Sequence, residues 1–196
     1  MRRQITLGQY RAIDLTILMV SLAVSQLLIY LATSFWYPEQ MYVASPVAGI
    51  TALILMRWSG WAAVPAVLGG VLYAFLEGGT VQHLVIFGAG NLFSLLSLLL
   101  LRIYGKERIR KDSFLSMVFA FCTQLLMQLG RAGIAAAFGW SAAACIGFIT
   151  TDVLSLLFTM LIIWIARRIE GLFEDQKHYL LRIQKQERHV ERGEPY

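Results

Sequence analysis

The sequence predicts an all-α integral membrane protein, a compact bundle of six membrane-spanning helices with both termini in the cytoplasm and a C-terminal amphipathic cytoplasmic helix. Of its 196 residues, 58% are hydrophobic and 15% are charged, and the mean hydropathy is +0.63. Soluble domains are about half apolar and about a quarter charged. The apolar residues form runs long enough to cross a bilayer. The net charge of +5 lies in short basic islands between those runs, a pattern that indicates membrane topology and not a nucleic-acid-binding face.

Six apolar runs are candidate spans, because about 20 mostly apolar residues cover a bilayer core of roughly 30 Å. They are Ile13–Trp36, Met41–Arg57, Trp61–Leu76, Val81–Leu101, Ser113–Phe138 and Ala142–Ala166. The second and third runs are short. The second run ends at Arg57, and only Trp58, Ser59 and Gly60 lie between it and the third run. The two runs form either two spans or one re-entrant hairpin, and we favour two spans. Ser45 and Pro46 are a favourable N-cap and first-turn pair, which predicts that a helix begins there.

The basic residues predict which side of the membrane each link faces, since cytoplasmic links carry an excess of Lys and Arg. With six spans, the N-terminal end, the links after the second and fourth spans and the C-terminal tail fall on one side. These segments hold all the basic residues except Arg131, and the opposite links, 37–40, 77–80 and 139–141, hold none. We therefore expect a multi-pass protein of the plasma membrane with both ends inside.

The chain becomes polar after Ala166, which divides it into a membrane domain, 1–166, and a cytoplasmic tail, 167–196. Apolar residues recur at helical spacing over Arg167–Glu191 and predict an amphipathic helix. In one interpretation this helix continues the last span along the cytoplasmic membrane surface. In the other it is a docking helix for a cytoplasmic partner.

Polar side chains fall inside three predicted spans, where ionisable groups are costly and are functional candidates by default. Gln124, Gln128 and Arg131 occupy one stripe of the fifth span. Asp152 in the sixth span and Asn91 in the fourth lie at a similar depth, in the outer-to-middle layer of the membrane. Stripes that face one another would surround a pocket that opens to the outside.

Two interpretations of these residues are open. Arg131 and Asp152 either form an ion pair that only ties two helices together, or they belong to a ligand site. In the ligand site, which we favour, Arg131 meets an anionic group, Asp152 is its counter-charge or a hydrogen-bond acceptor, and the three amides orient polar ligand atoms. Trp36 is a candidate lid residue over the ligand, although aromatic belts at membrane interfaces also explain its position.

Small residues at every fourth position predict close helix packing, because helices in lipid need small side chains to approach one another. Ala62, Ala66 and Gly70 form such a stripe in the third span, and Ser21 and Ser25 form one in the first. These stripes either pack inside the chain or face another membrane protein.

Motifs for catalysis are missing from the sequence. It has no paired-carboxylate metal motif, no His-Glu-x-x-His, no nucleophile elbow and no P-loop. Cys122 and Cys145 are predicted near opposite sides of the membrane, so no redox couple is expected. We therefore expect no enzymatic activity, no cofactor, no metal site and no nucleic-acid partner.

The chain resembles the substrate-binding S components of energy-coupling factor (ECF) transporters over nearly all of its length before the tail. The resemblance rests on six short spans with both ends inside, on Ser21-x-x-x-Ser25, on the Trp58–Pro65 entry into the third span with Gly69-Gly70, and on the polar stripes of the last three spans. It implies a receptor that captures a vitamin-like micronutrient under the first outer link. It also implies a transmembrane coupling subunit, driven by two ATPase subunits, that touches small residues, typically alanines where this chain has serines.

Two functions outside this resemblance remain open. The chain could be a sensory or scaffold module of the membrane, with the amphipathic tail as its output. It could also be a stand-alone proton-coupled carrier that uses Asp152, although such carriers often have inverted repeats and residues 1–100 and 101–196 show no convincing one. Metal-importing relatives have a His-rich N-terminal site, which this N-terminus lacks, so the resemblance implies an organic solute.

Overall fold

The structure is a computed structural model that describes residues 6–36 and 43–191, with side chains up to residue 183. Over these residues all regular secondary structure is helical, which confirms the predicted α class. Five helical segments are long and apolar enough to cross a membrane, and they are Leu7–Trp36, Val47–Leu76, Val81–Tyr104, Ser113–Ala137 and Ala142–Arg168. They are consistent with a multi-pass membrane protein, whereas the count of six spans and the cytoplasmic position of both ends stay predictions. The first outer link and the predicted start of the second span at Met41 lie outside the described residues.

The segment Val47–Leu76 folds back on itself and contains the two short runs of the sequence. Its parts are α2 (Val47–Trp58), the 3₁₀ turn η1 (Ser59–Ala62) and α3 (Ala63–Leu76). Ser59 has a φ of 52°, which is uncommon for a residue other than glycine and interrupts the helix. A Cβ on Gly69 of α3 would lie 2.9 Å from the side chain of Val47, so α3 runs back along α2.

α2 is the innermost helix of the bundle, because all 12 of its residues are buried. Residues 43–46, which lead into it, are not helical and lie beside the break between α8 (Ala142–Thr150) and α9 (Val153–Arg168). The backbone N–H of Val43 donates to the carbonyl of Thr151, and the N–H of Ser45 donates to Oγ of Ser155, both at 2.9 Å. These bonds supply the partners that non-helical backbone needs inside an apolar medium.

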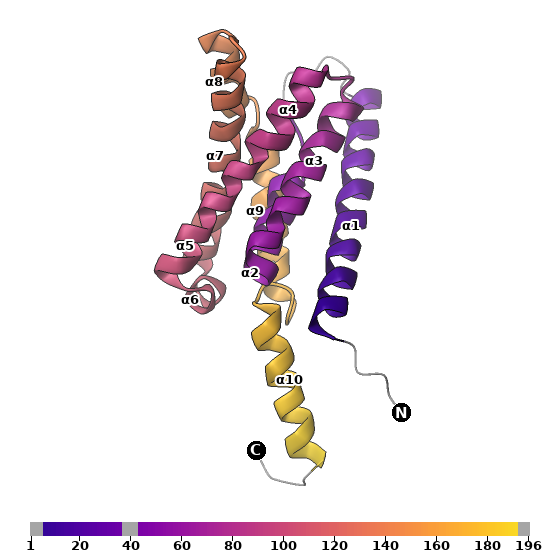
Figure 1. The fold of residues 1–196 in the computed structure, drawn as a ribbon, viewed down its shortest axis with the longest axis vertical. Helices are drawn as coiled ribbons and strands as arrows, with labels where there is room; N and C mark the ends of the chain where they lie inside the picture. Colours follow the sequence, from indigo (N-terminus) through magenta and orange to yellow (C-terminus); the bar gives the residue numbers. More distant parts are fainter. Residues whose placement is uncertain (1–5, 37–42, 192–196) are drawn as a thin grey trace.

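The remaining elements are, in chain order, α1 (Leu7–Trp36), α4 (Val81–Gly90), the 3₁₀ segment η2 (Asn91–Leu96), α5 (Ser97–Tyr104), α6 (Lys106–Lys111), α7 (Ser113–Ala137) and α10 (Gln176–Glu191). Of these, α1 and α7 pack directly on α2, as do α3 and α9. α1 packs mainly on α2 and α3, whereas α7 packs on α4, η2, α8 and α9. In Figure 1, α1 and the pair α7 and α8 stand on opposite sides of the bundle, and α10 extends below it.

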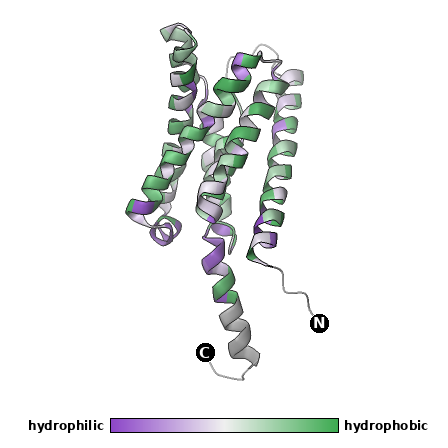
Figure 2. Cartoon of the chain, viewed as in Figure 1, coloured by the Kyte–Doolittle hydropathy of each residue, from purple (hydrophilic) through white to green (hydrophobic). Residues whose placement is uncertain are grey.

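The start of α1, the turn between α2 and α3, α6 and the start of α10 lie at one end of the molecule, which we call the basic end (Figure 1). Figure 2 shows hydrophilic residues at this end and mostly apolar residues along the helices above it. The tail differs from the continuous helix predicted from Arg167, since α9 ends at Arg168 and α10 begins only at Gln176. Gly171 between them has a φ of 74°, a left-handed conformation that glycine adopts readily, so the chain turns here.

Candidate functional site

Five polar side chains that the sequence analysis singled out meet inside the bundle. They come from η2, from α7 and from the break between α8 and α9, and each exposes 5% or less of its surface. We call them the polar cluster: Asn91, Gln124, Gln128, Arg131 and Asp152. Their role in binding a ligand stays a prediction, but the three polar stripes do face one another.

The carboxylate of Asp152 is the centre of the cluster. Its Oδ2 atom accepts hydrogen bonds from Nε2 of Gln124 at 2.7 Å, from Nη1 of Arg131 at 3.0 Å and from Nε2 of Gln128 at 3.3 Å. Arg131 also donates from Nε to Oδ1 of Asn91 at 2.7 Å. The guanidinium and the carboxylate therefore form a buried ion pair that the amides surround.

Two of the amides position the ion pair, since both ends of each amide are engaged. Asn91 accepts from the guanidinium and donates from Nδ2 to the carbonyl of Ala66 at 2.9 Å. Gln124 donates to the carboxylate and accepts from Oγ1 of Thr159 at 3.1 Å. These contacts connect the cluster to α3 and α9, so the geometry of the pair is set by four elements of the fold.

Two glycines bring the backbones around the cluster close together. A Cβ on Gly130 of α7 would collide with the carbonyl oxygen of Gly90, and a Cβ on Gly90 would lie 2.7 Å from the backbone nitrogen of Arg131. Only glycine permits this approach without a shift of the helices. The contact places Asn91, the residue after Gly90, within reach of the guanidinium.

Three atoms of the cluster have no hydrogen-bond partner among the described residues. They are Oδ1 of Asp152, Nη2 of Arg131 and Oε1 of Gln128. The first of them is fully buried, and the hydroxyl of Ser155, which lies beside this carboxylate, donates instead to the carbonyl of Val43 at 3.3 Å. Buried polar atoms are nearly always paired in native proteins, and an unpaired one indicates a functional role or a missing partner such as a water or a ligand. The cluster therefore has one donor and two acceptors that are available to a ligand.

Aromatic side chains extend from the cluster toward the end of the bundle opposite the basic end. The guanidinium carbon of Arg131 lies 4.7 Å from the ring centroid of Phe87, a cation–π contact. Phe87 meets Phe148 edge to face with centroids 5.7 Å apart, and Phe148 stacks on Trp140 at 5.8 Å. Trp140 lies in the turn between α7 and α8. The guanidinium thus has polar neighbours on one side and an aromatic wall on another.

The predicted stripe of small residues in the third span packs inside the chain. Ala62, Ala66 and Gly70 are buried, and the carbonyl of Ala66 accepts the hydrogen bond from Asn91. A Cβ on Gly70 would collide with the backbone of Phe87 in α4. The stripe therefore joins α3 to α4 and η2. Of the two interpretations of this stripe, its buried position favours packing inside the chain over a partner interface.

Three predicted residues lie on α1, away from the cluster. Ser21 is exposed, and the hydroxyl of Ser25 donates to the carbonyl of Ser21 at 2.7 Å, so this pair stays a prediction for a partner surface. Trp36 ends α1 and exposes 75% of its surface. The residues that follow it, 37–42, lie outside the described part of the chain, and its role as a lid stays a prediction.

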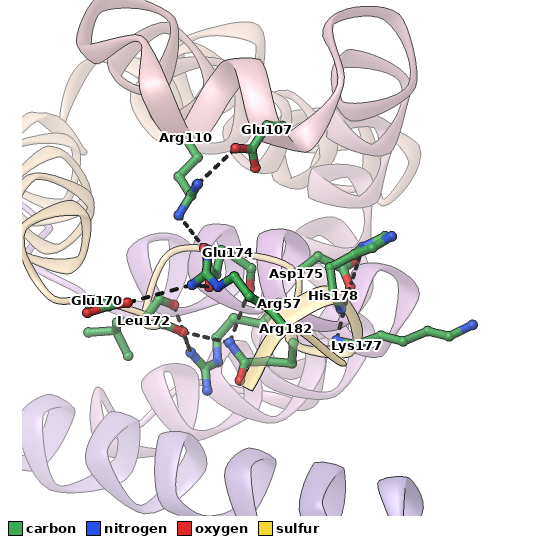
Figure 3. Close-up of polar contacts among 12 residues, drawn as sticks. Arg57, Glu107, Arg110, Glu170, Leu172, Glu174, Asp175, Lys177, His178 and Arg182 are labelled. Carbon is green, nitrogen blue, oxygen red and sulfur yellow. Dashed lines mark hydrogen bonds and ion pairs between the residues drawn. The ribbon is translucent and has the colours of Figure 1, made fainter. Parts of the chain in front are cut away.

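A second polar network, which sequence reasoning missed, holds the turn between α9 and α10 at the basic end (Figure 3). Arg57, at the end of α2, donates from Nη1 to the carbonyls of Gly171 and Leu172, each at 2.8 Å. It also pairs with Asp14 of α1, with 2.5 Å between Nη2 and Oδ1. The sequence signal that could have revealed this network is Asp14, an acidic residue near the start of the first apolar run.

α6 attaches the same turn from another side. Nζ of Lys106 lies 2.6 Å from Oδ2 of Asp175, and Arg110 pairs with Glu174, which also accepts from Arg182 at 2.8 Å. Burial would raise the pKa of Asp175, but the hydrogen bond and the charge of Lys106 outweigh it and lower that pKa. These pairs fix the start of α10 to the bundle.

The described residues contain no group of three or more His, Cys, Asp and Glu side chains that could hold a metal ion. Comparison of the chain with protein-family models, with curated proteins and with solved structures finds no match. The assignment of a function therefore depends on the residues and on the geometry of the cluster.

Proposed function

We propose that the protein is the substrate-binding subunit of a membrane importer for a small organic micronutrient. It captures the solute outside the cell, and a separate ATP-driven module powers delivery. The observation that carries the proposal is the polar cluster inside the bundle, where Arg131, Gln128 and Asp152 keep unused hydrogen-bonding atoms. Ionisable side chains at membrane depth are costly and mark ligand or ion pathways. The resemblance to ECF S components supports the class of importer.

The cluster contains more than an ion pair between two helices needs. Arg131 and Asp152 alone would tie α7 to the start of α9, yet three amides surround them. A network built only for stability is expected to satisfy all its buried polar atoms, and Oδ1 of Asp152 has no partner among the described residues. A bound solute that supplies that partner accounts for both features.

The proposal includes the finer topology. The bundle would cross the plasma membrane of a prokaryotic-type cell six times, with the basic end in the cytoplasm. α2 and α3 would be separate short crossings, which the preceding residues 43–46 and the turn η1 lengthen. The transmembrane coupling subunit would contact α1 along Ser21 and Ser25, and it would connect the receptor to two ATPase subunits.

The test is native mass spectrometry of the full chain, purified gently from its host. We expect a small molecule and the coupling subunit to be retained by the wild-type protein. Arg131→Ala is expected to weaken binding of that molecule by about tenfold or more, as is usual for the loss of a buried charged contact. Arg102→Ala, which removes an exposed charge at the basic end, is the control. A folded Arg131→Ala protein with unchanged affinity would remove Arg131 from the site.

One observation favours a second candidate, a sensory module with α10 as its output. Arg57 connects the turn before α10 to α2, which begins beside the polar cluster. Deletion of residues 176–196 separates the two functions. A receptor keeps its solute after the deletion, whereas a sensory module loses the recruitment of its signalling partner.

A further inference from the structure

The charges of the polar cluster restrict the kind of solute that it can hold. The side chains of Arg131 and Asp152 are 4% and 1% exposed, and Nη1 lies 3.0 Å from Oδ2. Within the described part of the chain, neither makes an ion pair with any other residue. The positive and the negative charge balance each other, so the site is neutral before a solute arrives.

A solute with one net charge would disturb this balance. A bound anion would compete with Asp152 for the guanidinium, and a bound cation would compete with Arg131 for the carboxylate. Either would leave a charge without a partner in the bundle interior, where unpaired charges are strongly disfavoured. Asn91 and Gln124 hold the pair together through short hydrogen bonds of 2.7 Å, so the pair is not free to separate.

The unused atoms of the cluster give the complementary pattern. Nη2 of Arg131 is a donor, whereas Oδ1 of Asp152 and Oε1 of Gln128 are acceptors. A solute that satisfies them presents a hydrogen-bond acceptor next to one or two donors, as an amide, lactam or ureido group does. Phe87 lies beside the guanidinium and Phe148 lies against Phe87, so the surroundings of the cluster on this side are aromatic and apolar and suit a flat, partly apolar solute.

We infer that the cluster binds a solute without net charge, whose edge carries adjacent acceptor and donor groups and whose body is flat and partly apolar. Arg131 then acts as a hydrogen-bond donor within an intact ion pair. This inference rests on the proposed function and replaces the anionic ligand that the sequence suggested.

Three probes of nearly equal shape test the inference, because benzamide is neutral, benzoate is an anion and benzamidinium is a cation at neutral pH. Their affinities are measured by thermal-stabilisation titration of the full chain in lipid nanodiscs. We expect the wild-type protein to bind benzamide about tenfold or more tightly than either ion. Asp152→Asn leaves the guanidinium unbalanced and is expected to shift the preference to benzoate. Arg131→Gln is expected to shift it to benzamidinium, and Arg102→Gln, the matched control, is expected to leave it unchanged.

The possible outcomes test the inference and the proposed function separately. Tighter binding of benzoate or benzamidinium by the wild-type protein overturns the inference and leaves a ligand site in place. When no probe binds, the molecule retained in native mass spectrometry decides: a net charge at neutral pH overturns the inference, and a neutral or zwitterionic molecule supports it. If no probe binds and no molecule is retained, the proposed function fails, and the inference fails with it.

Discussion

Removal of the carboxylate at the centre of the polar cluster is expected to be the most damaging single change. Asp152 is 1% exposed, and its Oδ2 accepts from Gln124, Gln128 and Arg131 at 2.7, 3.3 and 3.0 Å. In Asp152→Ala the guanidinium keeps Asn91 as a partner but has no balancing charge. Breaking a buried ion pair by removing one member costs about 3–5 kcal/mol, and we expect a loss of this size in the free energy of unfolding.

The double variant Arg131→Met with Asp152→Ala is the matched control, because it removes both charges. Apolar replacement of a whole buried pair is often neutral or stabilising. The double variant is therefore expected to be more stable than Asp152→Ala alone. In a double-mutant cycle the interaction between the two positions is expected to reach about 2–3 kcal/mol.

The assay is a denaturant titration of the purified protein in mixed micelles, followed by tryptophan fluorescence. A loss of less than about 1 kcal/mol in the free energy of unfolding of Asp152→Ala would refute the reasoning, because an unpaired buried charge destabilises a protein by more than that. Additivity of the two single variants within about 0.5 kcal/mol would refute it as well, because independent sites behave in that way.

Three further perturbations have expected outcomes. Gly130→Ala places a Cβ against a facing backbone carbonyl and is expected to lower the free energy of unfolding by about 1–3 kcal/mol, whereas Gly133→Ala, with no atom within 4 Å of the new Cβ, is expected to cause no loss. Arg57→Gln removes two carbonyl contacts to the turn at 169–175, and hydrogen exchange in that turn is expected to become faster. The pKa of Asp175 is lowered in the folded protein, so its pairing stabilises the tail above the unfolded pKa of about 4 and is lost as the pH falls through the folded value. Hydrogen exchange at the start of α10 is therefore expected to rise only below about pH 4.

Opposite results would each identify a specific error. Equal stability of the two glycine variants would mean that α7 moves away from η2 without cost. Unchanged exchange in Arg57→Gln would mean that the contacts of α6 hold the turn by themselves. An increase in exchange that begins well above about pH 4 would mean that a group other than Asp175 controls the start of α10.

Much of the bundle could be predicted from the lengths of apolar runs. The predicted fifth run, Ser113–Phe138, differs from α7 by one residue at its end, because a long uninterrupted apolar helix is what hydropathy detects best. The helix start expected at Ser45 and Pro46 and the separation expected at Arg57–Gly60 agree with α2, which begins at Val47 and is interrupted at Ser59. The backbone conformation of Ser59 could not be predicted in the same way. Hydropathy carries no information on φ, and it does not distinguish an apolar residue that faces lipid from one that faces protein.

The members of the polar cluster could be predicted from depth and helical spacing, since both follow from counting residues along a helix. Arg131, Asn91 and Asp152 meet for that reason. Counting could not reveal that Asp152 sits at a break between α8 and α9, with a φ of −94° and a ψ of 25°. The network around Arg57 could not be predicted for another reason. Two of its acceptors are backbone carbonyls of the turn between α9 and α10. The helical periodicity of the tail gave no indication of that turn.

The fold-back at Ser59 has a consequence for biogenesis. α2 has 12 residues and α3 has 14, so they are about 18 and 21 Å long at 1.5 Å per residue, and each is shorter than a hydrocarbon core of roughly 30 Å. Neither arm is suited to leave the translocon alone, and the two are expected to insert as a pair. α2 then stays incompletely surrounded until α7 and α9 have been translated, since those late helices provide much of its covering.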